Sequence, residues 1–240
     1  WRFSRNDSAM AMAPAFDDSG WHTVRVPHDW SVAEPFGPQY ASGNGYAAGG
    51  IGWYRKHFTL TPTQRHRLVT IEFDGVYDHS EVWLNGQFIG GRPYGYSSFQ
   101  LDLTRYVSFE HENILAVRVD HSRYADSRFY TGSGIYRHVR LVLTNPLHLG
   151  TWDTFVSTPS ISDDAAAVRV ETKVSNAATA PSEFSLRSEI VAADGRIVAS
   201  RTLSGQVAAG QSQALIQELE VSQTQRWSLQ TPTLYTLRNR

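Results

Sequence analysis

Apolar and polar residues alternate with a period of two in segment after segment of this 240-residue chain. In LVTIEFD, the residues Val69, Ile71 and Phe73 fall on one side of an extended backbone, and polar residues fall on the other. The same period occurs in NILAVRVD (113–120) and RHVRLVL (137–143). Helical periodicity is almost absent, so the first part of the chain is predicted to be all β.

A turn signal interrupts the stretch SEVWLNGQFIG. Two strand-like runs flank Asn85-Gly86, the dipeptide that best accepts the positive φ angles of a type I′ turn. The sequence therefore predicts a β-hairpin at this point.

The composition changes after TNPLHLGTW, where aromatic residues thin out and Ala, Ser, Thr and Val increase. We predict two domains, residues 1–146 and 147–240. In the second, alternating runs such as AVRVETKVSN are separated by Asp194-Gly195 and Ala209-Gly210. About seven short strands in roughly 95 residues are typical of an immunoglobulin-like β-sandwich. The first domain, with its long irregular loops, is predicted to be a jelly-roll β-sandwich.

Composition excludes several classes of partner. Lysine plus arginine (22) nearly balances aspartate plus glutamate (23), and no basic run is interleaved with aromatics, so no nucleic-acid partner is expected. The absence of cysteine excludes disulfides and thiolate metal sites. No apolar run approaches the roughly 18 residues of a membrane helix. Seven tryptophans and 12% aromatic residues fit a carbohydrate partner, because aromatic rings stack on sugars, although most of them are expected in the core of the strands.

The Gly-Ser-Gly motif in FYTGSGIYRHVRL suggests two kinds of chemistry, a nucleophile elbow or a phosphate loop. A nucleophile elbow needs its serine between a strand and a helix, whereas Gly132-Ser133-Gly134 leads into an alternating strand. A phosphate loop needs glycines that open a helix, and no helix is predicted after these glycines, so this interpretation fails as well. Two interpretations remain open from the residues alone. The loop either presents a stacking and hydrogen-bonding surface or forms a packed corner of the sandwich.

Neither histidines nor carboxylates form a catalytic pattern. Most histidines are scattered singly, without the spacing of a zinc site. His28-Asp29 in VPHDW is a tight pair, but neighbours on a strand point to opposite faces, which favours a structural turn with a buried Trp30. No carboxylate pair suited to glycoside hydrolysis is evident. We expect neither catalytic residues nor a metal site in this chain.

Five blocks carry a resemblance to a known family. These are FDDSGWHTVRVPHDW, GGIGWYRKHF, FDGVYDHSEVWLNGQFIGGRPYGYSSFQLDLTRY, NILAVRVD and RFYTGSGIYRHVRL. In this order they resemble the amino-terminal sugar-binding domain of glycoside hydrolase family 2, which includes β-galactosidases, β-glucuronidases and β-mannosidases. VRVETKVSN and WSLQTPTLYTLR resemble the immunoglobulin-like domain that follows in these enzymes.

The resemblance implies that catalysis resides in a third domain, a (β/α)₈ barrel that carries an acid/base glutamate and a nucleophile glutamate. The alternating βαβα pattern of such a barrel is missing here. We therefore expect a non-catalytic N-terminal fragment, inactive alone and without a cofactor, of a retaining β-galactosidase in carbohydrate metabolism. The expected partners are a β-galactoside-type carbohydrate, the enzyme's own C-terminal barrel and, for the full enzyme, further copies in a homo-oligomer. A periplasmic or secreted location is expected, with the cytoplasm as the alternative.

In the family, the loop before SGIYR helps to shape the sugar subsite. The resemblance thus implies substrate-binding roles for Asp126, Ser127, Arg128 and Tyr130. Arg128 aligns with an aspartate that contacts sugar and sodium in some β-galactosidases, so a sodium site is not expected. Gly49 stands where those enzymes have a substrate-contacting asparagine.

Two alternatives remain open. One is the front end of a β-glucuronidase or β-mannosidase, because the residues that select the sugar lie mainly in the barrel. The other is a freestanding carbohydrate-binding module. A planar row of exposed aromatics on a sheet face would favour the module, and a bare apolar rim around the loop at residues 129–136 would favour the enzyme.

Overall fold

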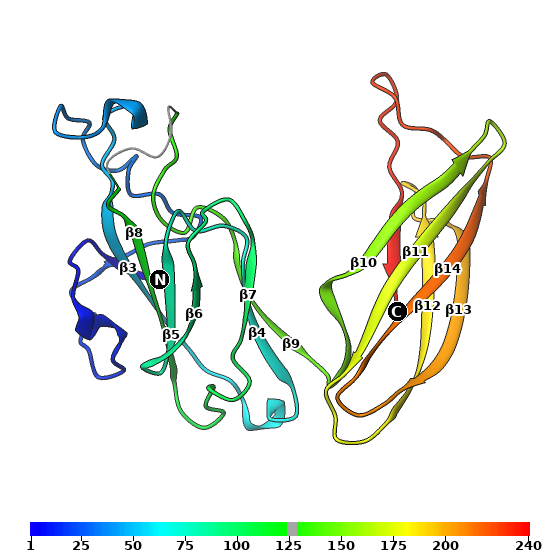
Figure 1. The fold of residues 1–240 in the computed structure, drawn as a ribbon, viewed down its shortest axis with the longest axis horizontal. Coiled ribbons are helices and arrows are strands. Elements are labelled where there is room, and N and C mark those ends of the chain that lie inside the picture. Colours follow the sequence, from blue (N-terminus) through cyan, green and yellow to red (C-terminus); the bar gives the residue numbers. More distant parts are fainter. Residues whose placement is uncertain (124–128) are drawn as a thin grey trace. The chain divides into compact units, whose positions relative to one another are not determined.

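The computed structural model describes residues 1–123 and 129–240 of the chain. The chain divides into two compact units, Trp1–Thr144 and Asn145–Arg240 (Figure 1). Both consist of antiparallel strands joined by loops, which confirms the all-β prediction. Within the described ranges, no helix is long and apolar enough to cross a membrane.

The first unit is a sandwich of two sheets, with strand orders β2-β1-β3-β8-β5-β6 and β7-β4-β9. Its strands are β1 (Arg2–Ser4), β2 (His22–Thr23), β3 (Gly50–Phe58), β4 (Leu68–Phe73), β5 (Ser80–Leu84), β6 (Gln87–Arg92), β7 (Phe99–Asp102), β8 (Asn113–His121) and β9 (Val139–Thr144). Three short 3₁₀ helices lie in its loops: η1 (Ala9–Met12), η2 (Ser42–Asn44) and η3 (Pro62–Gln64).

The predicted alternation forms the core of this sandwich. Val69 and Phe73 on β4 are fully buried, and so are Val117 and Val119 on the opposing β8. Each such side chain contributes about 1.5–3 kcal/mol through the removal of apolar surface from water. On β9 the alternation does not bury every apolar residue: Leu141 is 37% exposed, because β9 pairs only with β4 and forms an open edge of its sheet.

The predicted hairpin joins β5 to β6. Asn85 and Gly86 both have positive φ angles, 52° and 81°, as a type I′ turn requires. The Asn85 side chain also accepts a hydrogen bond from the backbone N–H of Ile114 at 2.9 Å and donates one to the Tyr106 carbonyl at 3.0 Å. This residue therefore shapes the turn and ties it to β8.

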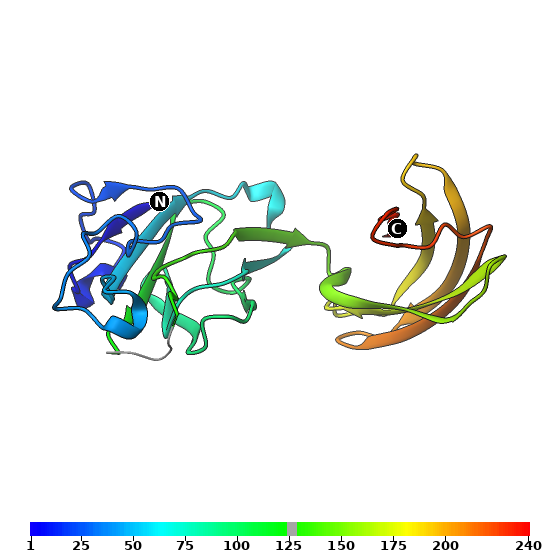
Figure 2. The same cartoon turned by 90° about the horizontal axis from the view of Figure 1, so that it is seen from above.

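The second unit is a sandwich of two three-stranded sheets, β10-β11-β14 and β13-β12-β15 (Figure 2). Its strands are β10 (Leu147–Ile161), β11 (Ala165–Asn176), β12 (Ser182–Val191), β13 (Ile197–Val207), β14 (Ser212–Ser222) and β15 (Thr236–Asn239). Six strands, most of them long, replace the predicted seven short ones. β10 continues through two register shifts against β11, which absorb the breaks that Gly150 and Pro159 suggest in the sequence.

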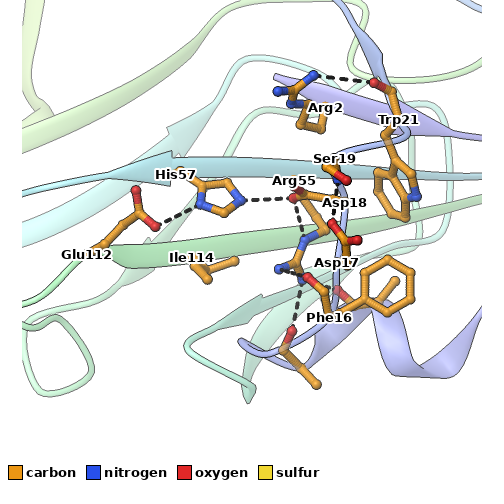
Figure 3. Close-up of polar contacts among 12 residues, drawn as sticks. Arg2, Phe16, Asp17, Asp18, Ser19, Trp21, Arg55, His57, Glu112 and Ile114 are labelled. Atoms are coloured by element: carbon orange, nitrogen blue, oxygen red, sulfur yellow. Dashed lines mark hydrogen bonds and ion pairs between the residues drawn. The ribbon is translucent and has the colours of Figure 1, made fainter.

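Hydrogen bonds from a buried arginine hold the N-terminal segment against the outer face of the six-stranded sheet (Figure 3). The fully buried Arg55 on β3 donates to the Asp18 carboxylate at 2.8 Å and to the carbonyls of Ala11 and Ala13. His57 lies two residues further along β3. Its Nε2 is 2.9 Å from the same Asp18 oxygen, and its Nδ1 is 2.9 Å from a Glu112 oxygen. A buried guanidinium needs such partners, because an unpaired charge would be strongly destabilising.

The His57 contacts make the stability of the first unit dependent on pH. Only a protonated imidazole can donate from both ring nitrogens. Burial opposes that charge, but the hydrogen bonds to Glu112 and Asp18 outweigh it and raise the pKa of His57 above its ordinary value of 6.5. The stabilisation is therefore fully present below pH 6.5 and is lost as the pH rises through the raised pKa.

We predict that His57→Gln reduces this pH dependence. The native chain should lose about 0.5 kcal/mol more unfolding free energy between pH 5.5 and pH 8.5 than the variant, the size typical of partly exposed ion pairs. Urea denaturation followed by tryptophan fluorescence measures the difference. Other groups, including His28, titrate in both proteins, so their contributions to the pH dependence cancel in the comparison. Identical pH profiles would contradict the assignment.

Candidate functional site

The VPHDW turn and the loop at residues 129–136 are joined by one carboxylate. Asp29 Oδ1 accepts hydrogen bonds from the backbone N–H groups of Ser31 and Ser133, both at 2.9 Å. Asp29 Oδ2 accepts the hydroxyl of Tyr130. Burial and the neighbouring Asp29 carboxylate raise the pKa of Tyr130 well above its ordinary range, so its hydroxyl stays protonated and donates. We call this arrangement the Asp29 clamp.

The two glycines of the GSG motif permit close approach to this clamp. Gly132 has φ +74°, and a Cβ there would lie 2.6 Å from Asp29 Oδ2. Gly134 has φ +124°, and a Cβ there would lie 2.3 Å from the Tyr54 hydroxyl. Any side chain would therefore be strained and would also collide with neighbouring atoms. The two glycines therefore belong to a packed corner of the sandwich, whereas Phe129 and Tyr130 in the same loop are exposed.

A chain of buried hydroxyls continues the network beneath the loop. The Ser31 hydroxyl lies 2.6 Å from the Ala48 carbonyl and 2.7 Å from Ser133 Oγ, and it can donate to either oxygen. Ser133 Oγ lies 2.7 Å from His121 Nδ1, so the network reaches from the VPHDW turn to the end of β8.

The His28-Asp29 pair is not a catalytic dyad, because the two side chains bind different partners. His28 Nδ1 lies 2.7 Å from the hydroxyl of Tyr54, whereas Asp29 binds the loop. Burial lowers the pKa of His28, which keeps the ring neutral. Trp30 is buried beside them, as the prediction of a structural turn requires.

An aromatic rim and a polar hollow lie at this end of the first unit. The exposed aromatics Phe36, Tyr46, Phe129 and Tyr130 are 44–67% exposed. Hydrogen bonds tie their loops together, since Asn44 Oδ1 accepts the backbone N–H of Thr131 at 3.1 Å. The hollow has a volume of 310 Å³, and its lining includes Arg5, Gln39, Tyr40, Asn44, His121 and Arg123.

This lining offers hydrogen bonds rather than acid–base catalysis. No carboxylate lines the hollow among the described residues, and residues 1–123 and 129–240 contain no cluster of His, Asp and Glu that could hold a metal ion. Donors from arginine, amide and hydroxyl groups suit a hydroxyl-rich ligand.

The structure places Tyr130 in the clamp. The other predicted substrate-binding residues, Asp126, Ser127 and Arg128, lie outside the described residues. Gly49 borders the hollow, and a Cβ there would lie 2.6 Å from the His121 carbonyl, so the asparagine of some β-galactosidases would not fit without a backbone shift.

Sequence reasoning missed the roles of Asp29, Asn44 and His121. One local signal existed, because Asp29 accepts the N–H two residues on, as aspartates in turns commonly do.

Comparison with known proteins gives two matches in sequence order. Residues 1–146 match the family model described as the sugar binding domain of glycosyl hydrolases family 2, and residues 149–240 match the model described as glycosyl hydrolases family 2. The chain belongs to glycoside hydrolase family 2. The resemblance of the five sequence blocks is thereby confirmed.

Relatives within family 2 have more than one activity. The chain is 42% identical to the β-galactosidase BoGH2A of Bacteroides ovatus over 99% of its own length and 28% of that protein. It is 38% identical to a putative β-glucuronidase of Formosa agariphila, over 98% of the chain and 22% of the relative. A crystal structure of a family 2 glycosyl hydrolase from Bacteroides cellulosilyticus superposes with a TM-score of 0.93 at 38% identity, over 100% of the chain and 33% of that protein. The chain thus spans about a third or less of these family 2 proteins.

We predict that Gly132→Ala destabilises the first unit of this family 2 chain by about 2–4 kcal/mol, through backbone strain and the collision with Asp29. Gly45→Ala is the matched control, because Gly45 has φ +68° with nothing within 4 Å of the added Cβ. It should cost only about 1 kcal/mol. Urea denaturation measures both, and equal losses would contradict the close approach.

We predict that Asp29→Ala costs about 3 kcal/mol, because it leaves two backbone N–H groups and a phenol without their acceptor. Asp29→Asn should cost about 1 kcal/mol, since its carbonyl oxygen still accepts both N–H groups. Tyr130→Phe, which removes only the hydroxyl, should lower the unfolding free energy by about as much as Asp29→Asn. If Asp29→Asn is as damaging as Asp29→Ala in urea denaturation, the charge matters more than the backbone contacts.

Proposed function

We propose that this chain is the non-catalytic N-terminal part of a retaining β-galactosidase and completes a sugar site whose catalytic groups lie in a barrel domain. The observation that carries the proposal is the Asp29 clamp. Its hydrogen bonds to Tyr130 and Ser133 fix the position of the exposed aromatic loop beside the polar hollow, as the positioning of a substrate would require.

Two further observations support this assignment. Among the described residues, the lining of the hollow supplies hydrogen-bond donors but no carboxylate, whereas a retaining glycosidase needs two, roughly 5 Å apart. Hydrolysis would therefore depend on groups from another part of the enzyme. The exposed rim formed by Phe36, Tyr46, Phe129 and Tyr130 has the character of a surface that a partner covers, in this proposal the barrel.

A β-glucuronidase is the second candidate, because of the arginines at the hollow. Arg5 and Arg123 line it, and guanidinium groups favour the carboxylate of a uronic acid. Arg5 is partly engaged, with Nη1 3.5 Å from Glu34 and Nη2 2.7 Å from the Gly49 carbonyl, which leaves Arg123 as the main cation. The identity of 42% to a β-galactosidase favours the first candidate. A periplasmic or secreted location stays a prediction.

Hydrolysis of nitrophenyl glycosides tests the proposal. The complete protein that the gene encodes is assayed on the β-galactoside, β-glucuronide and β-mannoside, with the 240-residue chain beside it. We expect the complete protein to cleave the galactoside and the chain to cleave none. Preference for the glucuronide would assign the second candidate. A chain that hydrolyses any of the three would refute its non-catalytic role.

A matched pair of variants tests the role of the clamp in the complete protein. Gly132→Ala should lower kcat/KM by about tenfold to a hundredfold, because displacement of a substrate-positioning loop by about 1 Å has effects of this size. Gly45→Ala should leave kcat/KM within about twofold. A Gly132→Ala enzyme that folds and retains full kcat/KM would separate the clamp from substrate binding.

A further inference from the structure

A second hollow lies on the outer face of the six-stranded sheet, over β5, β6 and β8. It has a volume of 420 Å³, within the range of pockets that hold small molecules. The lining residues that carry the inference are His79, Glu81, Phe88, Arg92, Arg118 and Asp120. It shares no lining residue with the hollow at the loop end.

The strand period and one glycine create this hollow. Glu81 lies opposite Arg118 in the register of β5 and β8, and Asp120 follows on the same face of β8. Gly91 lies opposite Glu81 on β6 and cannot carry a side chain, because a Cβ there would lie 2.0 Å from the Ser80 carbonyl oxygen. No side chain of β6 therefore covers the sheet at Gly91, beside Glu81.

One wall is a rigid exposed aromatic ring. Phe88 is 57% exposed, and its ring packs edge-on against Trp83 with centroids 5.6 Å apart. Trp83 stacks in turn on the buried Trp53 at 5.3 Å. A supported ring of this kind offers a flat apolar surface at little cost in conformational entropy, and the C–H face of a sugar ring packs on such surfaces.

The floor holds donors and acceptors together. Arg118 lies 3.1 Å from Asp7, 3.6 Å from Glu81 and 3.2 Å from Asp120. The three carboxylates outnumber the two guanidinium groups at the hollow, Arg118 and Arg92, so the net charge of these five groups is negative and disfavours an anionic ligand. A neutral ligand with several hydroxyl groups does not meet this obstacle, because it can donate to carboxylates and accept from arginine.

At the rim, an aspartate orients a histidine. His79 Nδ1 lies 2.7 Å from Asp78 Oδ2, so Nδ1 carries a proton and Nε2 of the neutral ring can accept one from a ligand. His79 also has φ +41°, a conformation that non-glycine residues adopt rarely and that concentrates at functional sites.

We propose that this hollow is a second saccharide-binding site, specific for neutral sugars. Phe88 stacks on the sugar ring, and Glu81, Asp120, Arg118 and His79 bind its hydroxyl groups. The site is separate from the loop end, so its occupation requires neither the barrel nor hydrolysis.

Titration of the ¹⁵N-labelled 240-residue chain with lactose, followed by NMR, tests the proposal. We expect saturable shifts of the backbone amides of His79, Phe88 and Gly91, with a Kd on the order of 1 mM, as is typical of weak single-site binding. Methyl β-glucuronide should bind at least about fivefold more weakly because of the carboxylates. Lactose shifts confined to residues 129–134, or no saturable shift at tens of millimolar, would overturn the proposal.

Two phenylalanines provide a matched comparison, since Phe88 and Phe155 are 57% and 63% exposed. Phe88→Ala should weaken lactose binding about tenfold, whereas Phe155→Ala, on β10 of the second unit, should change it less than about twofold. Both substitutions are at exposed positions, and thermal melts check that each variant folds. Glu81→Gln, which keeps the shape but weakens an acceptor, should weaken binding about threefold. Equal effects of Phe88→Ala and Phe155→Ala would refute the site.

Discussion

The Asp29 carboxylate is the contact on which the loop end of the first unit depends. It accepts three hydrogen bonds, two of them from residues more than 100 positions away in the chain. Because the loop wraps closely around this carboxylate, Gly132 cannot carry a side chain. The same wrapping sets the position of Tyr130, and with it part of the aromatic rim. One acidic group thus determines both the backbone of the loop and the surface that it presents.

Charged residues have two different uses in the first unit. Three of them, Arg55, Asp18 and His57, have a structural role, because their contacts hold the N-terminal segment on the six-stranded sheet. That segment covers Trp53 and Ala116 on the outer face, and its Asp7 lies 3.1 Å from Arg118 on the floor of the second hollow. There Arg118 balances the nearby carboxylates at the surface and leaves hydrogen-bonding capacity for a ligand.

The two hollows differ in chemistry although they belong to one sandwich. At the loop end, arginine, amide and imidazole groups surround a space without a carboxylate among the described residues. On the sheet face, two carboxylates and two arginines line the hollow, and Phe88 forms a wall. The first arrangement accommodates a neutral or anionic sugar, and the second disfavours an anion. Family 2 membership fits a role in carbohydrate recognition for both.

The sequence by itself determined the all-β class, the hairpin at Asn85-Gly86 and the family, but not the number and length of the strands in the second unit. Period-two alternation and turn chemistry are local, so each segment carries its own signal. The exposure of Leu141 could not be predicted from this alternation, because it depends on the edge position of β9 in its sheet. Only the tertiary structure decided that Asp29 clamps the loop and that Gly91 leaves a hollow. In each case the partner atoms come from other strands or distant loops, and residue spacing cannot specify which carboxylate meets which amide once the sheets have packed.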